Sequence, residues 1–177
     1  MINSLDQQIF FRITENRSDF LTAIFSVFSW LGNWQFIVTA MLLIIIVLAV
    51  KRKFLFIAPF ILVVAGSSFL TYLGKLYFAR PRPLDSIFVE TGFSLPSGHA
   101  TVAVAFFAYL AFMLVRLSAG KKVKLIYSLA VLIILLIGFS RIYLGAHYLA
   151  DVLAGYLVGS VGLIGGIIWT KKLINIV

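Results

Sequence analysis

The sequence predicts an all-α bundle of membrane-spanning helices, and three observations predict it. Hydrophobic residues make up 62% of the 177 residues and charged residues only 12%, against roughly 45–50% and about 25% in a typical soluble domain. Long apolar runs recur along the chain, separated by short charged clusters. Cysteine is absent, so these residues offer neither a disulfide framework nor a cysteine metal site. We expect a single membrane-embedded domain over residues 1–177.

Residues 1–31 are expected to form an N-terminal interfacial region. Apolar side chains recur at helical spacing over 19–31, but ~13 residues at a rise of about 1.5 Å reach only ~20 Å, short of the ~30 Å hydrocarbon core. The first interpretation is an amphipathic helix in the membrane interface. A short span is the alternative, which a turn at Gly32-Asn33 would permit.

Five clear spans follow, or six in total if 19–31 also spans. They occupy the apolar runs at 34–50, 54–78, 98–115, 125–143 and 148–169. Successive spans alternate in direction, which places the basic clusters on one side of the bilayer; these clusters are Lys51–Lys53, Arg116–Lys124 and Lys171–Lys172. They hold nine of the fifteen Lys and Arg residues, so the positive-inside rule assigns that side to the cytoplasm.

The opposite side of this multi-pass protein receives the loop 79–97 and the turn 144–147. In a cell or inner membrane, chemistry at these segments would face the periplasm or the exterior. The same topology accounts for most of the net charge of +9, so no nucleic-acid partner is expected.

The stretch 140–151 lies between two apolar runs and yet holds Arg141, His147 and Asp151. Charged side chains at membrane depth cost about 2.5–3.5 kcal/mol each on insertion scales, which makes them functional candidates. His147 and Asp151 are four residues apart, so on a helix they share one face. A carboxylate beside an imidazole can hold its tautomer and its orientation.

Two further polar clusters belong to the same side of the membrane. Lys75 and Arg82 flank the point where a helix ends and a proline-rich loop begins. Ser97, Gly98 and His99 stand at a helix start, where free backbone N–H groups, a hydroxyl and the positive end of the helix dipole favour an anion.

A phosphoryl group is the ligand that fits these clusters together. Three cations, Lys75, Arg82 and Arg141, would surround it, and arginine matches phosphate oxygens with two parallel hydrogen bonds. A phosphoryl transition state needs such a preorganised cage. Asp151 is the only one of the six carboxylates inside a catalytic-looking cluster, so we expect no metal and no cofactor.

The three motifs occur in the order Lys-x6-Arg-Pro, Pro-Ser-Gly-His and Ser-Arg-x5-His-x3-Asp. In this order they resemble the type-2 phosphatidic acid phosphatase family, which includes membrane lipid phosphatases, bacterial acid phosphatases and the vanadium haloperoxidases. The resemblance covers roughly residues 54–170, the expected catalytic core. Leu149-Ala150 stands where a Pro-Thr or Pro-Ser pair is more common, and neither position carries chemistry.

The resemblance implies a covalent mechanism, whereas the residues alone leave open which histidine attacks. It makes His147 the nucleophile that forms a phosphohistidine, Asp151 its orienting partner, and His99 the acid and base. The phosphate-binding residues that it implies are Lys75, Arg82, Ser97, Gly98 and Arg141.

The function expected from this family is hydrolysis of a lipid phosphate or pyrophosphate at the outer face. Candidate substrates are undecaprenyl pyrophosphate, phosphatidylglycerophosphate and phosphatidic acid, with a lipid A phosphate as the alternative. An anion transporter is a hypothesis of another class, although the spans look continuous and the polar clusters all lie at one end. A vanadate-dependent haloperoxidase is a third.

Several other residues have plainer interpretations. Arg80 is expected to contact a lipid headgroup or solvent, and Asp85 and Glu90 to be solvated loop residues. Tyr148 is expected to anchor the chain at the interface. The spacing of small residues from Gly155 to Gly159 favours helix packing within the chain over a dimer interface, and the oligomeric state stays open.

Overall fold

The computed structural model describes residues 4–118 and 122–176, and these residues form helices and no strand. The helices in chain order are α1 (Ser4–Thr14), α2 (Asp19–Leu31), α3 (Trp34–Val50), the 3-10 helix η1 (Phe54–Phe56), α4 (Ile57–Phe78), α5 (Gly98–Ala103), the π-helix η2 (Val104–Ala108), α6 (Tyr109–Leu117), α7 (Val123–Tyr143) and α8 (Leu149–Ile176). The predicted all-α class is confirmed. Positions 1–3 of the predicted N-terminal region, 119–121 of the predicted cytoplasmic loop, and 177 lie outside the described residues.

Four stretches of helix in the described part of the chain are long and apolar enough to cross a membrane. They are Phe54–Phe78, Gly98–Leu117, Val123–Tyr143 and Leu149–Asn175. Helices α2 and α3 pass the same test together, although a bend of 49° separates them. The described residues therefore contain four candidate spans, or five if the bent pair counts as one, and residues 19–31 continue into 34–50 through this bend.

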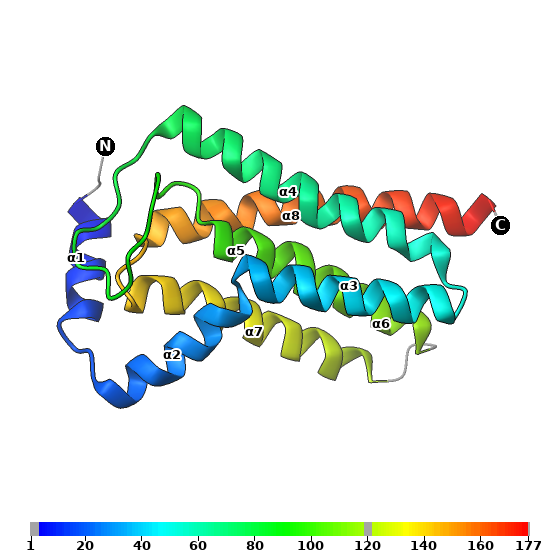
Figure 1. The fold of residues 1–177 in the computed structure, drawn as a ribbon, viewed down its shortest axis with the longest axis horizontal. Helices are drawn as coiled ribbons and strands as arrows, with labels where there is room; N and C mark the ends of the chain where they lie inside the picture. Colours follow the sequence, from blue (N-terminus) through cyan, green and yellow to red (C-terminus); the bar gives the residue numbers. More distant parts are fainter. Residues whose placement is uncertain (1–3, 119–121, 177) are drawn as a thin grey trace.

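The bundle has two distinct ends (Figure 1). The connection between α3 and α4, the end of α6, the start of α7 and the C-terminal end of α8 lie together at one end. The loop 79–97, the turn between α7 and α8, and helix α1 lie at the other. The structure thus groups the predicted polar clusters at one end of the bundle and the described basic clusters at the other.

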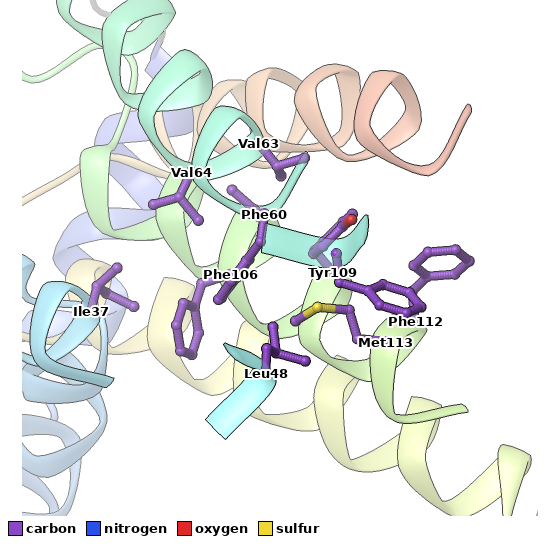
Figure 2. Close-up of a cluster of buried hydrophobic side chains, with 11 residues drawn as sticks. Ile37, Leu48, Phe60, Val63, Val64, Phe106, Tyr109, Phe112 and Met113 are labelled. Atoms are coloured by element: carbon purple, nitrogen blue, oxygen red, sulfur yellow. The ribbon is translucent and has the colours of Figure 1, made fainter. Parts of the chain in front are cut away.

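A buried hydrophobic cluster rich in aromatic side chains packs the helices together (Figure 2). Phe60 of α4 stacks on Tyr109 of α6 with ring centroids 5.6 Å apart, and both side chains are fully buried. The hydroxyl of Tyr109 lies 2.6 Å from that of Thr170 in α8, so the polar tip of the ring is satisfied. This core holds together α4, α6 and α8; the far ends of α4 and α8, and α5, which precedes α6 through η2, reach the polar clusters.

Two glycines of α8 allow this helix to approach α5 closely. A Cβ atom added at Gly155 would lie 2.6 Å from the carbonyl oxygen of Ser97, and one at Gly159 would lie 2.6 Å from that of Thr101. Only glycine permits such a close backbone approach between helices. The predicted role of this spacing in packing within the chain is confirmed, and it brings the starts of α5 and α8 together.

Candidate active site

His147 and Asp151 lie together where the turn after α7 enters α8. Nδ1 of His147 is 3.4 Å from Oδ2 of Asp151, and the backbone N–H of Tyr148 donates to the same oxygen at 2.9 Å. His147 is 2% exposed and Asp151 is fully buried. Nδ1 has no aligned hydrogen-bond partner among the described residues, and hydrogen bonds of this kind commonly tighten when substrate binds.

Burial controls the charge of His147. Loss of solvent is the largest cause that lowers the pKa of His147 to about 4; the guanidinium groups of Arg141 and Arg82 lower it further, against the opposing pull of Asp151. The imidazole is therefore neutral at pH 7. Its other nitrogen, Nε2, is 3.3 Å from Nη1 of Arg82, so it faces the cationic side of the site.

Arg82 connects the loop 79–97 with the turn that carries His147. Its Nη1 donates to the carbonyl oxygen of Ala146 at 3.1 Å, while Nε and Nη2 donate to those of Gly92 at 3.0 Å and Thr91 at 3.2 Å. The sharp turn that sends the loop across the site begins at Ala79, a non-glycine residue with a left-handed φ of 44°. Prolines 81 and 83 then disfavour a return to helix.

Arg141 and Lys75 complete the set of three predicted cations. Arg141, in the last turn of α7, is 2% exposed and donates to the hydroxyl of Ser29 and to Oε1 of Glu90. Its Nε has no partner among the described residues. Lys75, near the end of α4, donates to the carbonyl oxygen of Phe93 at 2.5 Å.

Glu90 lies inside the site, and its prediction as a solvated loop residue is wrong. Its carboxylate pairs with Arg141 and lies 3.6 Å from Nη1 of Arg82. Backbone carbonyls of the next three residues contact Arg82 and Lys75 as described above. All three cations therefore contact the segment 90–93, which brings a carboxylate and three carbonyl oxygens to the cage. Asp85, in contrast, is 61% exposed and pairs with Arg17.

The start of α5 lies beside this cage. Ser97 caps the helix, because its hydroxyl accepts from the N–H of Ala100 at 3.5 Å; its own N–H donates to the carbonyl oxygen of Asp151 at 2.9 Å. Gly98 and His99 line the main cavity. The bend between α2 and α3 supports His99, since a Cβ added at Gly32 would lie 3.0 Å from its Cδ2.

The main cavity has a volume of about 760 Å³ and lies between the α2–α3 bend, α4, α5 and the loop 79–97. Its lining combines apolar side chains, among them Trp30, Trp34 and Val38, with His99, Arg141 and Glu90. The cavity therefore combines an apolar wall with Arg141, one of the three cations of the cage. Within the described residues, no group of three or more His, Asp or Glu side chains could hold a metal ion.

Arg80 was expected to contact headgroups or solvent, and this prediction is wrong. It is 7% exposed and donates to Oδ1 of Asp151 at 2.7 Å and to Oδ2 of Asp6 at 2.7 Å. Tyr148, expected as an interfacial anchor, is buried, and the guanidinium of Arg80 lies 4.6 Å from the centre of its ring. Ser29 and Asp6 are site residues that sequence reasoning missed.

The chain belongs to the PAP2 superfamily, whose family model matches residues 56–175. Phosphatidylglycerophosphatase B from Bacillus subtilis is 39% identical over 88 residues, which cover 48% of this chain and 43% of that protein. An undecaprenyl-diphosphatase from Sulfolobus acidocaldarius is 30% identical over 95 residues, which cover 50% of this chain and 36% of that protein. The matched stretch thus spans less than half of either curated relative.

Two solved structures share the whole arrangement. A transmembrane PAP2-type phosphatidylglycerolphosphate phosphatase from Bacillus subtilis superposes with a TM-score of 0.91 at 28% identity, covering 96% of this chain and 86% of that one. Aquifex aeolicus LpxE superposes with a TM-score of 0.75 at 29% identity, covering 93% of this chain and 96% of that one. The family membership expected from the three motifs is therefore confirmed.

Proposed function

We propose that this protein is a membrane lipid phosphatase that hydrolyses a lipid phosphate or pyrophosphate through a phosphohistidine at His147. The observation that carries the proposal is that Nε2 of the buried, neutral His147 faces Arg82, while Glu90 links Arg82 to Arg141 at an apolar cavity. Its Nε2 is the free nucleophilic nitrogen if Nδ1 keeps its proton toward Asp151. Lys75, Arg82 and Arg141 hold the phosphoryl oxygens, with Gly98 at the start of α5.

The reaction has two steps, and the first transfers the phosphoryl group to His147. A bond forms between Nε2 of His147 and phosphorus while the bond from phosphorus to the leaving oxygen breaks, and His99 donates a proton to that oxygen. The imidazole ring then carries a positive charge, which Asp151 stabilises. In the second step His99 takes a proton from water, and the water oxygen bonds to phosphorus while the bond from phosphorus to Nε2 of His147 breaks. Phosphate leaves, and the imidazole of His147 is neutral again.

The substrate phosphoryl group takes the place that Glu90 and the carbonyls of 91–93 occupy. Glu90 supplies two carboxylate oxygens to Arg141 and Arg82, much as a phosphoryl group would. Binding then requires the segment 90–93 to move aside, since the same donors cannot serve both. Ser97 supports this site as the cap of α5, and its hydroxyl is engaged within its own helix.

The apolar wall of the cavity supports a lipid chain as the rest of the substrate. Undecaprenyl pyrophosphate, phosphatidylglycerophosphate and phosphatidic acid all combine such a chain with a phosphate, and the names of the curated relatives favour the first two. The similarity to LpxE favours a lipid A phosphatase as the second candidate. By the positive-inside rule the site faces outward from the cell membrane.

Metal-independent hydrolysis is part of the proposal. The three cations already supply the positive charge that a metal ion would otherwise bring to the phosphoryl oxygens, and they repel a divalent ion from the same place.

Phosphate release from a panel of these lipids in detergent tests the function and ranks the substrates. The wild-type protein is expected to release phosphate from at least one of them, and His147→Ala to release none above background. Asp85→Asn is the matched control, because its exposed side chain contacts Arg17 outside the cage. A protein that takes up phosphate into vesicles without hydrolysing any lipid would contradict the proposal.

A further inference from the structure

A chain of buried ionic contacts leads from His147 away from the cavity and into helix α1. Asp151 contacts His147 through Oδ2 and Arg80 through Oδ1. Arg80 uses its second terminal nitrogen to bind Asp6 at 2.7 Å. Asp6 and Arg80 are each 7% exposed and Asp151 is fully buried, so solvent screens these contacts little.

Asp6 uses both carboxylate oxygens to join α1 to this chain. Oδ2 accepts from Arg80, and Oδ1 accepts from the backbone N–H of Ala150 at 3.0 Å. Ala150 directly precedes Asp151 in the first turn of α8, where a carboxylate is favoured by the unsatisfied N–H groups. Phe10, one helical turn after Asp6, packs its ring 5.4 Å from that of Tyr148. One face of α1 thus docks on the helix start that carries Asp151.

These contacts leave the Asp151 carboxylate a single orientation. Oδ1 faces Arg80, and Oδ2 accepts from the N–H of Tyr148 on the side of His147. Removing Arg80 would free Oδ1 and leave two buried carboxylates, Asp6 and Asp151, without their shared cation. Buried charges without a partner are strongly unfavourable. The carboxylate of Asp151 would then rotate or shift, and Nδ1 of His147 would lose the oxygen that fixes the orientation of the ring.

The charges also match the needs of the reaction. Two carboxylates and one guanidinium sum to a single negative charge behind His147, and the imidazole gains a single positive charge when it bonds to phosphorus. The negative charge of this ionic chain therefore matches the positively charged ring of the phosphohistidine better than it matches the neutral imidazole of the free enzyme. A contact that strengthens along the reaction raises kcat rather than lowering KM.

We propose that Arg80 and Asp6 are positioning residues for the nucleophile: Arg80 fixes the carboxylate of Asp151, and Asp6 fixes Arg80, so that docking of α1 sets the orientation of His147. This inference rests on the proposed function, because it needs His147 as the nucleophile. A merely structural tether predicts something different. It would lower the amount of folded protein while leaving the kcat of the folded fraction unchanged.

The test uses the full-length protein in dodecyl maltoside micelles with dioleoylphosphatidic acid and measures released phosphate. Arg80→Gln is expected to lower kcat about tenfold to a hundredfold while KM changes by less than about threefold, as for the loss of a charge-assisted contact to a reacting group. Arg80→Lys, which keeps the charge, is expected to recover part of the loss. Asp6→Asn is expected to lower kcat by about three- to tenfold.

The double variant separates positioning from two independent effects. Because Asp6 acts through Arg80, the Asp6→Asn change is expected to add little to Arg80→Gln, with less than about a twofold further loss. Asp85→Asn is the matched control: the Arg17–Asp85 pair, 2.9 Å long, also ties the N-terminal segment to the loop 79–97, and it does not contact Asp151. Its kcat is expected to equal that of the wild type.

Wild-type kcat in folded Arg80→Gln, or losses that multiply in the double variant, would overturn the inference. If Arg80→Gln does not fold, Arg80→Lys and Asp6→Asn decide the question by the same split between kcat and KM. Failure of the proposed function is distinguishable, because His147→Ala would then keep its activity. An inactive His147→Ala beside an unaffected Arg80→Gln and Asp6→Asn would refute this inference alone.

Discussion

Replacing Glu90 by glutamine tests whether the Glu90 carboxylate occupies the phosphate site and must be displaced when a ligand binds. The change removes one negative charge and keeps the size of the side chain. In the structure this carboxylate pairs with Arg141 and Arg82, the two guanidinium groups that we assign to the substrate phosphoryl group. A ligand must displace it, so the affinity of the ligand is reduced by the fraction of molecules in which the site is open.

The size of this effect follows from the contacts. Hydrogen bonds to charged groups contribute about 1.5–3 kcal/mol, and every ~1.4 kcal/mol changes an equilibrium tenfold. The side chain of Glu90 is 21% exposed, which screens the pair and favours the lower figure. We therefore expect Glu90→Gln to lower the inhibition constant of orthovanadate, a phosphate mimic, by about tenfold. We also expect it to lower KM.

The assay is inhibition of lipid phosphate hydrolysis by vanadate in detergent, with Glu90→Asp as the control that keeps the charge. Glu90→Asp is expected to stay within about threefold of the wild type, since its shorter side chain still brings a carboxylate to the cage. An unchanged inhibition constant in Glu90→Gln, or a large loss of kcat with no change in KM, would refute the reasoning. The second result would give Glu90 a part in the reaction itself.

Three further predictions concern protonation, packing and metal dependence. His99→Ala leaves His147 as the one histidine of the chain, so the imidazole of His147 can be titrated by NMR. We expect burial to give this imidazole a pKa of about 4, so that the ring is neutral above that pH. A pKa near 6.5 would contradict this prediction. Gly155→Ala is expected to lower the unfolding temperature in detergent, because its Cβ would meet the Ser97 carbonyl oxygen at a cost of about 1–3 kcal/mol. Gly165→Ala is the control and should leave the unfolding temperature unchanged, since nothing lies within 4 Å of the added Cβ. Equal unfolding temperatures for the two variants would contradict the prediction. Hydrolysis is expected to persist in excess chelator, and a strict requirement for Mg²⁺ would argue against the proposed mechanism.

Much of the fold and the site could be predicted because membrane helices have recognisable local sequence patterns. An apolar run of membrane length indicates a span, and the four-residue spacing of His147 and Asp151 places them on one face without knowledge of the rest of the chain. The order of the three motifs then predicts which residues share an end of the bundle. Each of these inferences uses neighbours in sequence or the alternation of spans.

The missed residues depend on contacts between distant segments. Asp6 and Asp151 are linked through Arg80, and no local pattern reveals where an interfacial helix docks. A carboxylate on the same helical face as Phe10 was the available signal, since a buried face tolerates a charge only with a partner. Glu90 lies in a loop without periodicity, so its direction depends on the turn at Ala79 and on the cations that it meets.

The most direct test of the central claim is to trap the phosphoenzyme. Rapid acid quenching is avoided, because phosphohistidine is labile in acid; the wild-type protein is instead mixed with ³²P-labelled lipid phosphate and denatured in alkali. We expect a label that survives alkali, is lost in acid, maps to the peptide containing His147 and is absent from His147→Ala. Full hydrolytic activity in His147→Ala, or a label on another residue, would contradict the account.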